Sequence, residues 1–197
     1  MTGMWRAWAR GWRVIVPLIV VVAVIQSATV LGNPEPAPDL LFSLLTAASL
    51  VVTIGAVAIA AEAALAGVDG RRMSAPGGRL VLWSAAIVLG VTVVAVLLAV
   101  VTPLAIVLAL VLLPAVADGQ RNPLHGLVVF TRRPGRAVVF TLVALLVIAL
   151  SWVVALLLGF FVTGPLAAGV TWLWFGLVST LLLCRATSLY RRASPRQ

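Results

Sequence analysis

Residues 137–161 read AVVFTLVALLVIALSWVVALLLGFF, a stretch without a charged side chain. An α-helix rises about 1.5 Å per residue, and the hydrocarbon core of a membrane is about 30 Å thick. Roughly 20 consecutive apolar residues therefore cross that core, and this stretch is longer. The stretch predicts a transmembrane helix.

The whole chain shares this composition. Of its 197 residues, 63% are hydrophobic and only 10% are charged, and the mean hydropathy is +1.20. Soluble domains carry about a quarter charged residues and under half apolar ones, so a soluble fold of this size could not bury so much apolar surface. The composition predicts an all-α, polytopic transmembrane helical bundle that forms a single membrane domain.

Six apolar segments are candidates for spans. We expect them over residues 14–31, 40–66, 80–101, 104–117, 137–161 and 166–184. The fourth is the shortest, about 21 Å of helix, and it follows Thr102-Pro103, where the proline interrupts the preceding run. We expect it to cross the membrane as a thin span, because with this crossing the arginine-rich connections before and after it fall on the same side of the membrane. A re-entrant segment is the alternative.

The basic residues indicate the orientation. All of them are arginines, the net charge is +9, and every arginine falls on the same side of the six predicted spans. By the positive-inside rule that side is the cytoplasm, so we expect both termini there, with residues 185–197 as a basic cytoplasmic tail. Arginine clusters between apolar runs indicate contact with anionic lipid headgroups rather than with nucleic acid. Arginine-only usage is typical of a GC-rich bacterial genome, and we expect a multi-pass protein of the bacterial cytoplasmic (inner) membrane.

The first span has a superficial likeness to a secretory signal peptide, since a basic segment precedes an apolar one. Its apolar run is long, Pro17 lies inside it, and no clean Ala-x-Ala cleavage site follows. We therefore expect an uncleaved membrane anchor.

Residues 1–13 predict a separate amphipathic helix at the cytoplasmic interface. On a helical wheel three tryptophans fall on one side and three arginines lie beside them. Such a helix places indoles at headgroup depth and guanidinium groups toward phosphate. It either anchors and orients the first span or forms a docking surface for a lipid or a partner protein. The candidate contact residues are Trp5, Trp8, Trp12, Arg6, Arg10 and Arg13.

The connection between the fourth and fifth spans contains a second interfacial candidate. Residues 124–130 read LHGLVVF, which is too short to span but apolar at helical spacing, so we expect a short helix along the inner face. Three further candidate contact residues follow it: Arg132, Arg133 and Arg136. His125 has no cysteine or carboxylate neighbour in the sequence, so we interpret it as an interfacial residue rather than a ligand.

Two polar side chains inside the apolar segments are candidates for an intramembrane role, Gln26 and Glu62. Ionisable groups inside a membrane are costly and mark the pathways of pumps and coupled carriers. Glu62 lies about one turn from the cytoplasmic end of its span. We expect it to pair with an arginine of the following loop, such as Arg71 or Arg72. A proton-linked carboxylate is the alternative.

Small residues recur at four-residue spacing in two of the segments. They are Ala56, Ala60 and Ala64 in the second and Gly176 and Thr180 in the sixth. This spacing lets helices approach closely. We expect it to serve packing within the chain, because six helices must pack in any case, and a homo-oligomer face is the alternative.

Catalysis and metal binding are not expected. Five acidic residues and one histidine cannot supply a clustered metal site, and no Gly-rich phosphate loop, nucleophile elbow or paired carboxylate is present. Asp69 and Asp118 fall on the same side of the membrane but in separate loops. Cys184 is the single cysteine, which excludes an intrachain disulfide. The sequence thus predicts a protein without cofactor or metal.

Several short motifs carry a family resemblance over roughly residues 55–145. They are Ala63-Ala64-Leu65-Ala66-Gly67, Thr102-Pro103-Leu104, Leu113-Pro114-Ala115-Val116-Ala117-Asp118-Gly119 and Arg132-Arg133-Pro134-Gly135-Arg136. The layout resembles six-span bacterial membrane proteins of the glycerophosphoryl diester phosphodiesterase membrane-domain type and related uncharacterised families. The resemblance implies the six-span layout and an envelope- or lipid-related role. The resemblance assigns no functional residues to this sequence. We expect no hydrolase activity, because no soluble phosphodiesterase module is found in this sequence.

Two functions remain open. The leading hypothesis is a non-enzymatic accessory or scaffold subunit in envelope or lipid handling, with a protein partner or a second copy of the chain bound to it. The alternative is a small permease or export-system subunit that moves a lipid or small molecule. A carrier is expected to show a polar, water-accessible cavity lined by Gln26, Glu62 or the serines. A scaffold is expected to show a tightly packed bundle with an exposed apolar or basic surface.

Overall fold

The computed structural model describes residues 2–31, 40–162 and 164–194, and these residues are almost entirely helical. Six helical segments are long and apolar enough to cross a membrane, so the predicted all-α fold is confirmed. Seven α-helices and two short 3-10 turns make up the described chain. In order they are α1 (Thr2–Thr29), α2 (Leu40–Asp69), α3 (Gly78–Leu97), η1 (Ala99–Val101), α4 (Thr102–Ala117), η2 (Pro123–Leu127), α5 (Val128–Arg132), α6 (Pro134–Phe161) and α7 (Gly164–Ala193).

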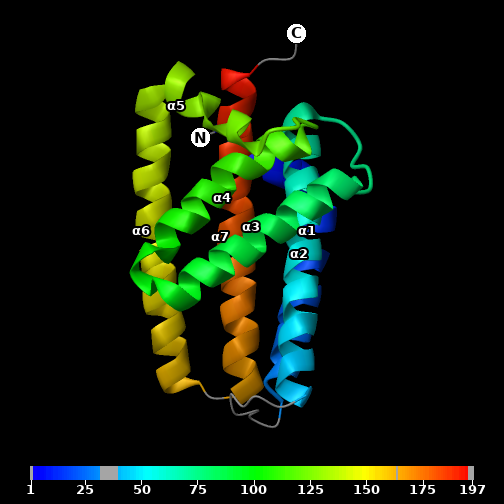
Figure 1. Ribbon diagram of the computed structural model, residues 1–197, viewed down its shortest axis with the longest axis vertical. Helices are drawn as coiled ribbons and strands as arrows, with labels where there is room; N and C mark the ends of the chain where they lie inside the picture. Colours follow the sequence, from blue (N-terminus) through cyan, green and yellow to red (C-terminus); the bar gives the residue numbers. More distant parts are fainter. Residues whose placement is uncertain (1, 32–39, 163, 195–197) are drawn as a thin grey trace.

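Each of the six long helices has a terminus at one end of the molecule. Helices α1, α3 and α6 begin there, and α2, α4 and α7 end there (Figure 1, upper part). Most of the arginines flank these termini, so we call it the arginine-rich end. The opposite end is where α1 and α6 end and where α2 and α7 begin.

Glycine and proline decide where several of these helices begin and end. Gly70 and Gly119 follow α2 and α4 with φ of 68° and 84°, a conformation that glycine adopts without strain. In both cases the next residue donates its backbone N–H back into the helix, as in a Schellman motif. Pro103 and Pro134 lie in the first turns of α4 and α6, where a missing N–H costs no hydrogen bond.

Helices α3 and α4 form a hairpin that runs obliquely across the other helices. Figure 1 shows α2, α6 and α7 nearly parallel, whereas α3 and α4 cross the view at an angle and join well short of the opposite end. The junction is apolar and exposed, with 78% of Val96 and 90% of Val100 accessible. The fourth segment, expected as a thin span, is thus one arm of an inclined hairpin that covers only part of the bundle.

The core lies in the arginine-rich half because the hairpin covers only that half. Buried residues of α2 run from Ala58 to Gly67, those of α6 from Ala137 to Ser151, and those of α7 from Thr180 to Ala193. In the opposite half the same helices expose large apolar side chains such as Leu156 and Phe160. Exposed apolar helix surface of this kind requires lipid as solvent.

The prediction of a separate interfacial helix over residues 1–13 is wrong. Helix α1 runs without interruption from Thr2 to Thr29. Ala7 is buried against Gly67 of α2, where an added Cβ would collide with the Ala7 carbonyl group. The indole of Trp8 lies 3.4 Å from the Thr180 hydroxyl of α7. The first turns are therefore part of the bundle, because packing against α2 and α7 holds them in line with the rest of α1.

The prediction that residues 185–197 form a tail separate from the sixth span also needs correction. Helix α7 continues to Ala193, and its last two turns contain the buried residues Thr187, Leu189 and Tyr190. Contacts with α4, α5 and α2 supply the burial that keeps this segment helical. Residues 195–197 lie outside the described chain.

Candidate functional site

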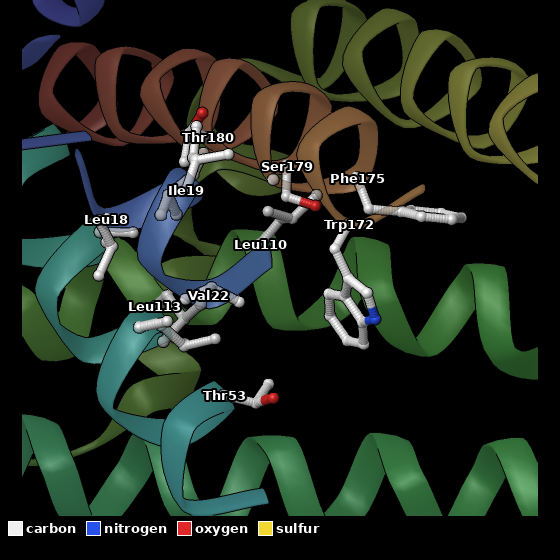
Figure 2. A pocket seen from close by; sticks show the side chains of 15 residues that line it. Leu18, Ile19, Val22, Thr53, Leu110, Leu113, Trp172, Phe175, Ser179 and Thr180 are labelled. Atoms are coloured by element: carbon white, nitrogen blue, oxygen red, sulfur yellow. The ribbon is translucent and has the colours of Figure 1, made fainter. Parts of the chain in front are cut away.

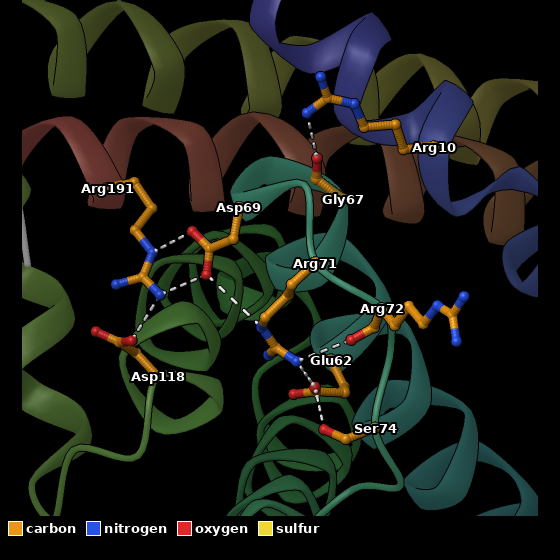
Figure 3. A network of polar contacts seen from close by, with 9 residues as sticks. All are labelled: Arg10, Glu62, Gly67, Asp69, Arg71, Arg72, Ser74, Asp118 and Arg191. Carbon is orange, nitrogen blue, oxygen red and sulfur yellow. Dashed lines mark hydrogen bonds and ion pairs between the residues drawn. The ribbon is translucent and has the colours of Figure 1, made fainter.

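The arginine-rich end is organised around Arg191 of α7. Its Nε and Nη2 atoms donate to the two carboxylate oxygens of Asp69 at 2.9 and 2.7 Å, and Nη2 also lies 2.7 Å from Asp118 Oδ1 (Figure 3). Two parallel bonds from one guanidinium to one carboxylate are a strong, geometrically specific pairing. Only 10% of the Arg191 side chain is exposed. This arrangement, the Arg191 clasp, joins the ends of α2, α4 and α7.

The clasp brings together two carboxylates that the sequence places in separate loops. Asp118 also accepts a hydrogen bond from the Tyr190 hydroxyl at 3.1 Å. The ring of His125 lies edge-on to Tyr190, with centroids 6.3 Å apart. Because the oxygens of Asp69 and Asp118 are occupied by Arg191 and Tyr190, these carboxylates serve to join helices rather than to face a reacting group.

Glu62 is held by the loop that follows α2. Arg71 Nη1 lies 2.7 Å from Glu62 Oε1, and the Ser74 hydroxyl donates to the same oxygen at 2.8 Å. The expected pairing with an arginine of this loop is confirmed, and Figure 3 shows that Arg72 points away from the carboxylate. Glu62 therefore fixes the α2–α3 connection against the end of α2.

Gln26 has a similar structural role between α1 and α2. Its amide nitrogen donates to the Ser49 carbonyl and to the Thr53 hydroxyl at 3.3 and 3.4 Å. The Ser49 hydroxyl donates to the Gln26 amide oxygen at 2.8 Å. With 3% of the residue exposed, Gln26 satisfies its polar atoms inside the bundle and has none left for a pathway.

The structure divides the candidate contact residues of the N-terminal segment into two groups. Trp5 and Trp12 are half exposed, whereas Trp8 is turned into the bundle toward Thr180. Arg6 and Arg10 line a cavity of about 260 Å³ at the arginine-rich end, together with two arginines of α7. We call it the arginine cavity; its lining residues are Arg6, Ala7, Arg10, Gly67, Val68, Ser188, Arg191 and Arg192. Arg13 is exposed and does not line it.

Two of the candidate arginines that follow residues 124–130 cap the C-terminal end of α7. Arg132 Nη1 donates to the Ala193 carbonyl at 2.9 Å, and Arg133 Nε donates to the Arg192 carbonyl at 3.3 Å. The last carbonyls of a helix have no partner within it and carry partial negative charge, so cations stabilise them. Arg136 is exposed. Sequence reasoning assigned the three to lipid or partner contact and missed this capping role.

The predicted short helix of residues 124–130 is found as the turn η2 followed by the single-turn helix α5. Gly126 is buried in direct contact with α4, and a Cβ there would collide with the Val111 carbonyl group. Pro123 and Val129 are also buried, whereas His125 is exposed. The segment is thus a fixed cover over the end of α4.

An apolar cavity of about 190 Å³ lies among α1, α2, α4 and α7 (Figure 2). Its wall is formed mainly by aliphatic and aromatic side chains, with Trp172 and Phe175 of α7 and Leu110 and Leu113 of α4 among them. Neither Gln26 nor Glu62 lines it. Sequence reasoning did not find this cavity, although Ala56 and Ala60 of the small-residue pattern contribute to its wall.

No protein-family model, curated protein or solved structure matches this chain. The resemblance to the phosphodiesterase-type membrane domains therefore stays a prediction. Within residues 2–31, 40–162 and 164–194, no group of three histidine, cysteine, aspartate or glutamate residues is placed to hold a metal ion.

Proposed function

We propose that this chain is a non-enzymatic protein of the bacterial inner membrane that binds lipid and acts as an accessory or scaffold subunit in lipid or envelope handling. The observation that carries the proposal is the apolar cavity among α1, α2, α4 and α7. It lies within helices that are long and apolar enough to span a membrane. The occupant that this chemistry fits is the acyl chain of a membrane lipid.

The lining of the cavity favours an acyl chain over a polar solute. A carrier of polar solutes needs polar groups that converge on a water-accessible cavity, but neither Gln26 nor Glu62 lines this one, and both side chains are engaged in hydrogen bonds within the protein. Thr53 and Thr180, which do line it, donate their hydroxyls to backbone carbonyls of their own helices at 2.8 and 3.0 Å. The remaining wall is mostly apolar, and apolar surface prefers an apolar occupant.

The arginine-rich half supports a scaffold role. The Arg191 clasp joins α2, α4 and α7, and the Glu62–Arg71 pair holds the loop after α2. Arg132 and Arg133 connect α5 and the start of α6 to the end of α7. These contacts fix the helices of the arginine-rich half relative to one another. Such rigidity is expected of a protein that holds its ligand, whereas a carrier must alternate between two open states.

A cavity-filling variant tests lipid binding. Ala56→Phe places a ring in the cavity, and Ala47→Phe adds the same ring to an exposed position of the same helix. We expect the purified Ala56→Phe protein to lose most crosslinking to a phospholipid that carries a photoactivatable group in its acyl chain. Ala47→Phe is expected to crosslink as the unmodified protein does, with adducts at Trp172 or Phe175. Equal crosslinking of both variants, with adducts spread over all lipid-facing helices, would refute the proposal.

The accessory role requires a second test. The tagged protein is purified from native membranes in mild detergent, and bound proteins are identified by mass spectrometry. We expect a stoichiometric partner that is lost in the double variant Trp5→Ala/Trp12→Ala, because these two indoles are the half-exposed aromatic groups of the first turns. Recovery of the protein alone, still loaded with lipid, would contradict the accessory role and favour the alternative of a lipid exporter.

A further inference from the structure

We propose that the arginine cavity binds the phosphate group of an anionic phospholipid. This site is separate from the apolar cavity: it is formed by the arginine-rich ends of α1, α2 and α7, whereas the apolar cavity is formed by more central residues. Failure of one site therefore leaves the other intact. Among the residues that the structure describes, four arginines and no acidic residue line the cavity.

The charge in the cavity is only partly neutralised. Arg191 is paired with Asp69 and Asp118, so its charge is compensated from behind the cavity. Arg10 makes one long hydrogen bond, 3.4 Å to the Gly67 carbonyl. The guanidinium groups of Arg6 and Arg192 make neither hydrogen bond nor ion pair with any residue of the described chain. Three positive side chains therefore converge on one cavity in which the described residues supply no matching anion.

The cavity is fixed before a ligand binds. The close contact between Ala7 and Gly67 sets α1 against α2, and the bidentate bond of Arg191 to Asp69 sets α7 against α2. Helices held in this way present Arg6, Arg10 and Arg192 from fixed backbone positions, which lowers the entropic cost of binding. Guanidinium groups pair with phosphate through two parallel hydrogen bonds, which makes arginine well suited to this group.

The neighbouring residues indicate a lipid as the source of the phosphate. Trp5 and Trp12 lie half exposed on the same turns of α1 as Arg6 and Arg10. Indole side chains prefer the headgroup region of a membrane. Basic pockets between membrane helices at that depth are typical binding places for anionic headgroups. The arginine cavity thus lies where the phosphate of a phospholipid would lie.

The test compares two double variants that remove the same charge. Arg6→Gln/Arg192→Gln empties the cavity of its two unpaired cations, and Arg13→Gln/Arg136→Gln removes two exposed cations outside it. Each full-length protein is titrated in detergent with phosphatidylglycerol and with phosphatidylcholine, and bound lipids are counted by native mass spectrometry. Gel filtration and thermal melting confirm that each variant is folded.

We expect the unmodified protein to prefer phosphatidylglycerol. Arg6→Gln/Arg192→Gln should bind it at least about tenfold more weakly, since the loss of even one charge-assisted bond weakens binding by roughly that factor. Arg13→Gln/Arg136→Gln should bind it nearly as the unmodified protein does. An equal loss in both variants would show that only surface charge matters, and would overturn the proposal. Saturable binding of inorganic phosphate alone, lost in the cavity variant and competing with the lipid, would overturn the lipid source and assign a soluble anion.

Discussion

Arg191 and Asp69 form a two-point ion pair across 122 residues of sequence, with nitrogen–oxygen distances of 2.9 and 2.7 Å. Asp118 shares the same guanidinium. One guanidinium thus contacts two carboxylates at the place where α2, α4 and α7 end. We infer that this contact holds the arginine-rich half together.

Removal of the central cation should destabilise the fold strongly. In Arg191→Gln both carboxylates, which are largely buried, lose their contacts with this guanidinium, and breaking a buried pair from one side typically costs about 3 kcal/mol or more. We expect a clear fall in the melting temperature of the detergent-purified protein. Arg136→Gln, at an exposed position, is the matched control and should melt as the unmodified protein does. Similar melting of both variants would contradict the role of the clasp.

Replacement of Glu62 should cost less. In Glu62→Gln, Arg71 keeps a second carboxylate, Asp69, at 3.8 Å, and the arginine is one-third exposed. Partly exposed pairs contribute on the order of 1 kcal/mol. The melting temperature should therefore fall less than in Arg191→Gln. A loss as large as that of Arg191→Gln would show that Glu62, rather than Arg191, is the main anchor of this end.

Two glycines of α2 provide a test of helix packing. Gly67→Ala introduces a methyl group that collides with the Ala7 carbonyl, so we expect a loss of about 2 kcal/mol from overpacking. Gly55→Ala meets no atom within 4 Å and should stabilise the helix by up to about 1 kcal/mol. Thermal melting of the two variants measures the difference. If Gly67→Ala were as stable as Gly55→Ala, the first turns of α1 would not pack against α2 as described.

The depth of the α3–α4 hairpin can be measured with single cysteines in a Cys184→Ala background. We expect Val100→Cys to resist a membrane-impermeant maleimide added from either side, because the apolar junction ends short of the opposite end of the bundle (Figure 1). Leu31→Cys, an exposed position near that end, should react from one side. Reaction of Val100→Cys from the same side as Leu31→Cys would mean that the hairpin crosses the membrane completely.

Local features of the chain predicted much of the fold and little of the site. The six long helices follow from apolar segments longer than a bilayer needs, and Glu62 and Arg71 pair because only nine positions separate them. The Arg191 clasp could not be predicted in this way, because Asp69, Asp118 and Arg191 lie at the ends of three helices whose relative positions depend on side-chain packing. The same reason explains why Arg132 and Arg133, read as surface cations, cap α7 instead.

The sequence by itself determined that the chain is helical, that six helices are apolar enough to span, and that nearly all charges gather at one end. Hydropathy and helix periodicity act over neighbouring residues, so each segment carries this information alone. Only the tertiary structure decided that α1 is unbroken, that α7 extends to Ala193, and that α3 and α4 cover only the arginine-rich half. These features depend on which surfaces fit together, as Gly67 fits against Ala7, and such fit is a property of two segments at once.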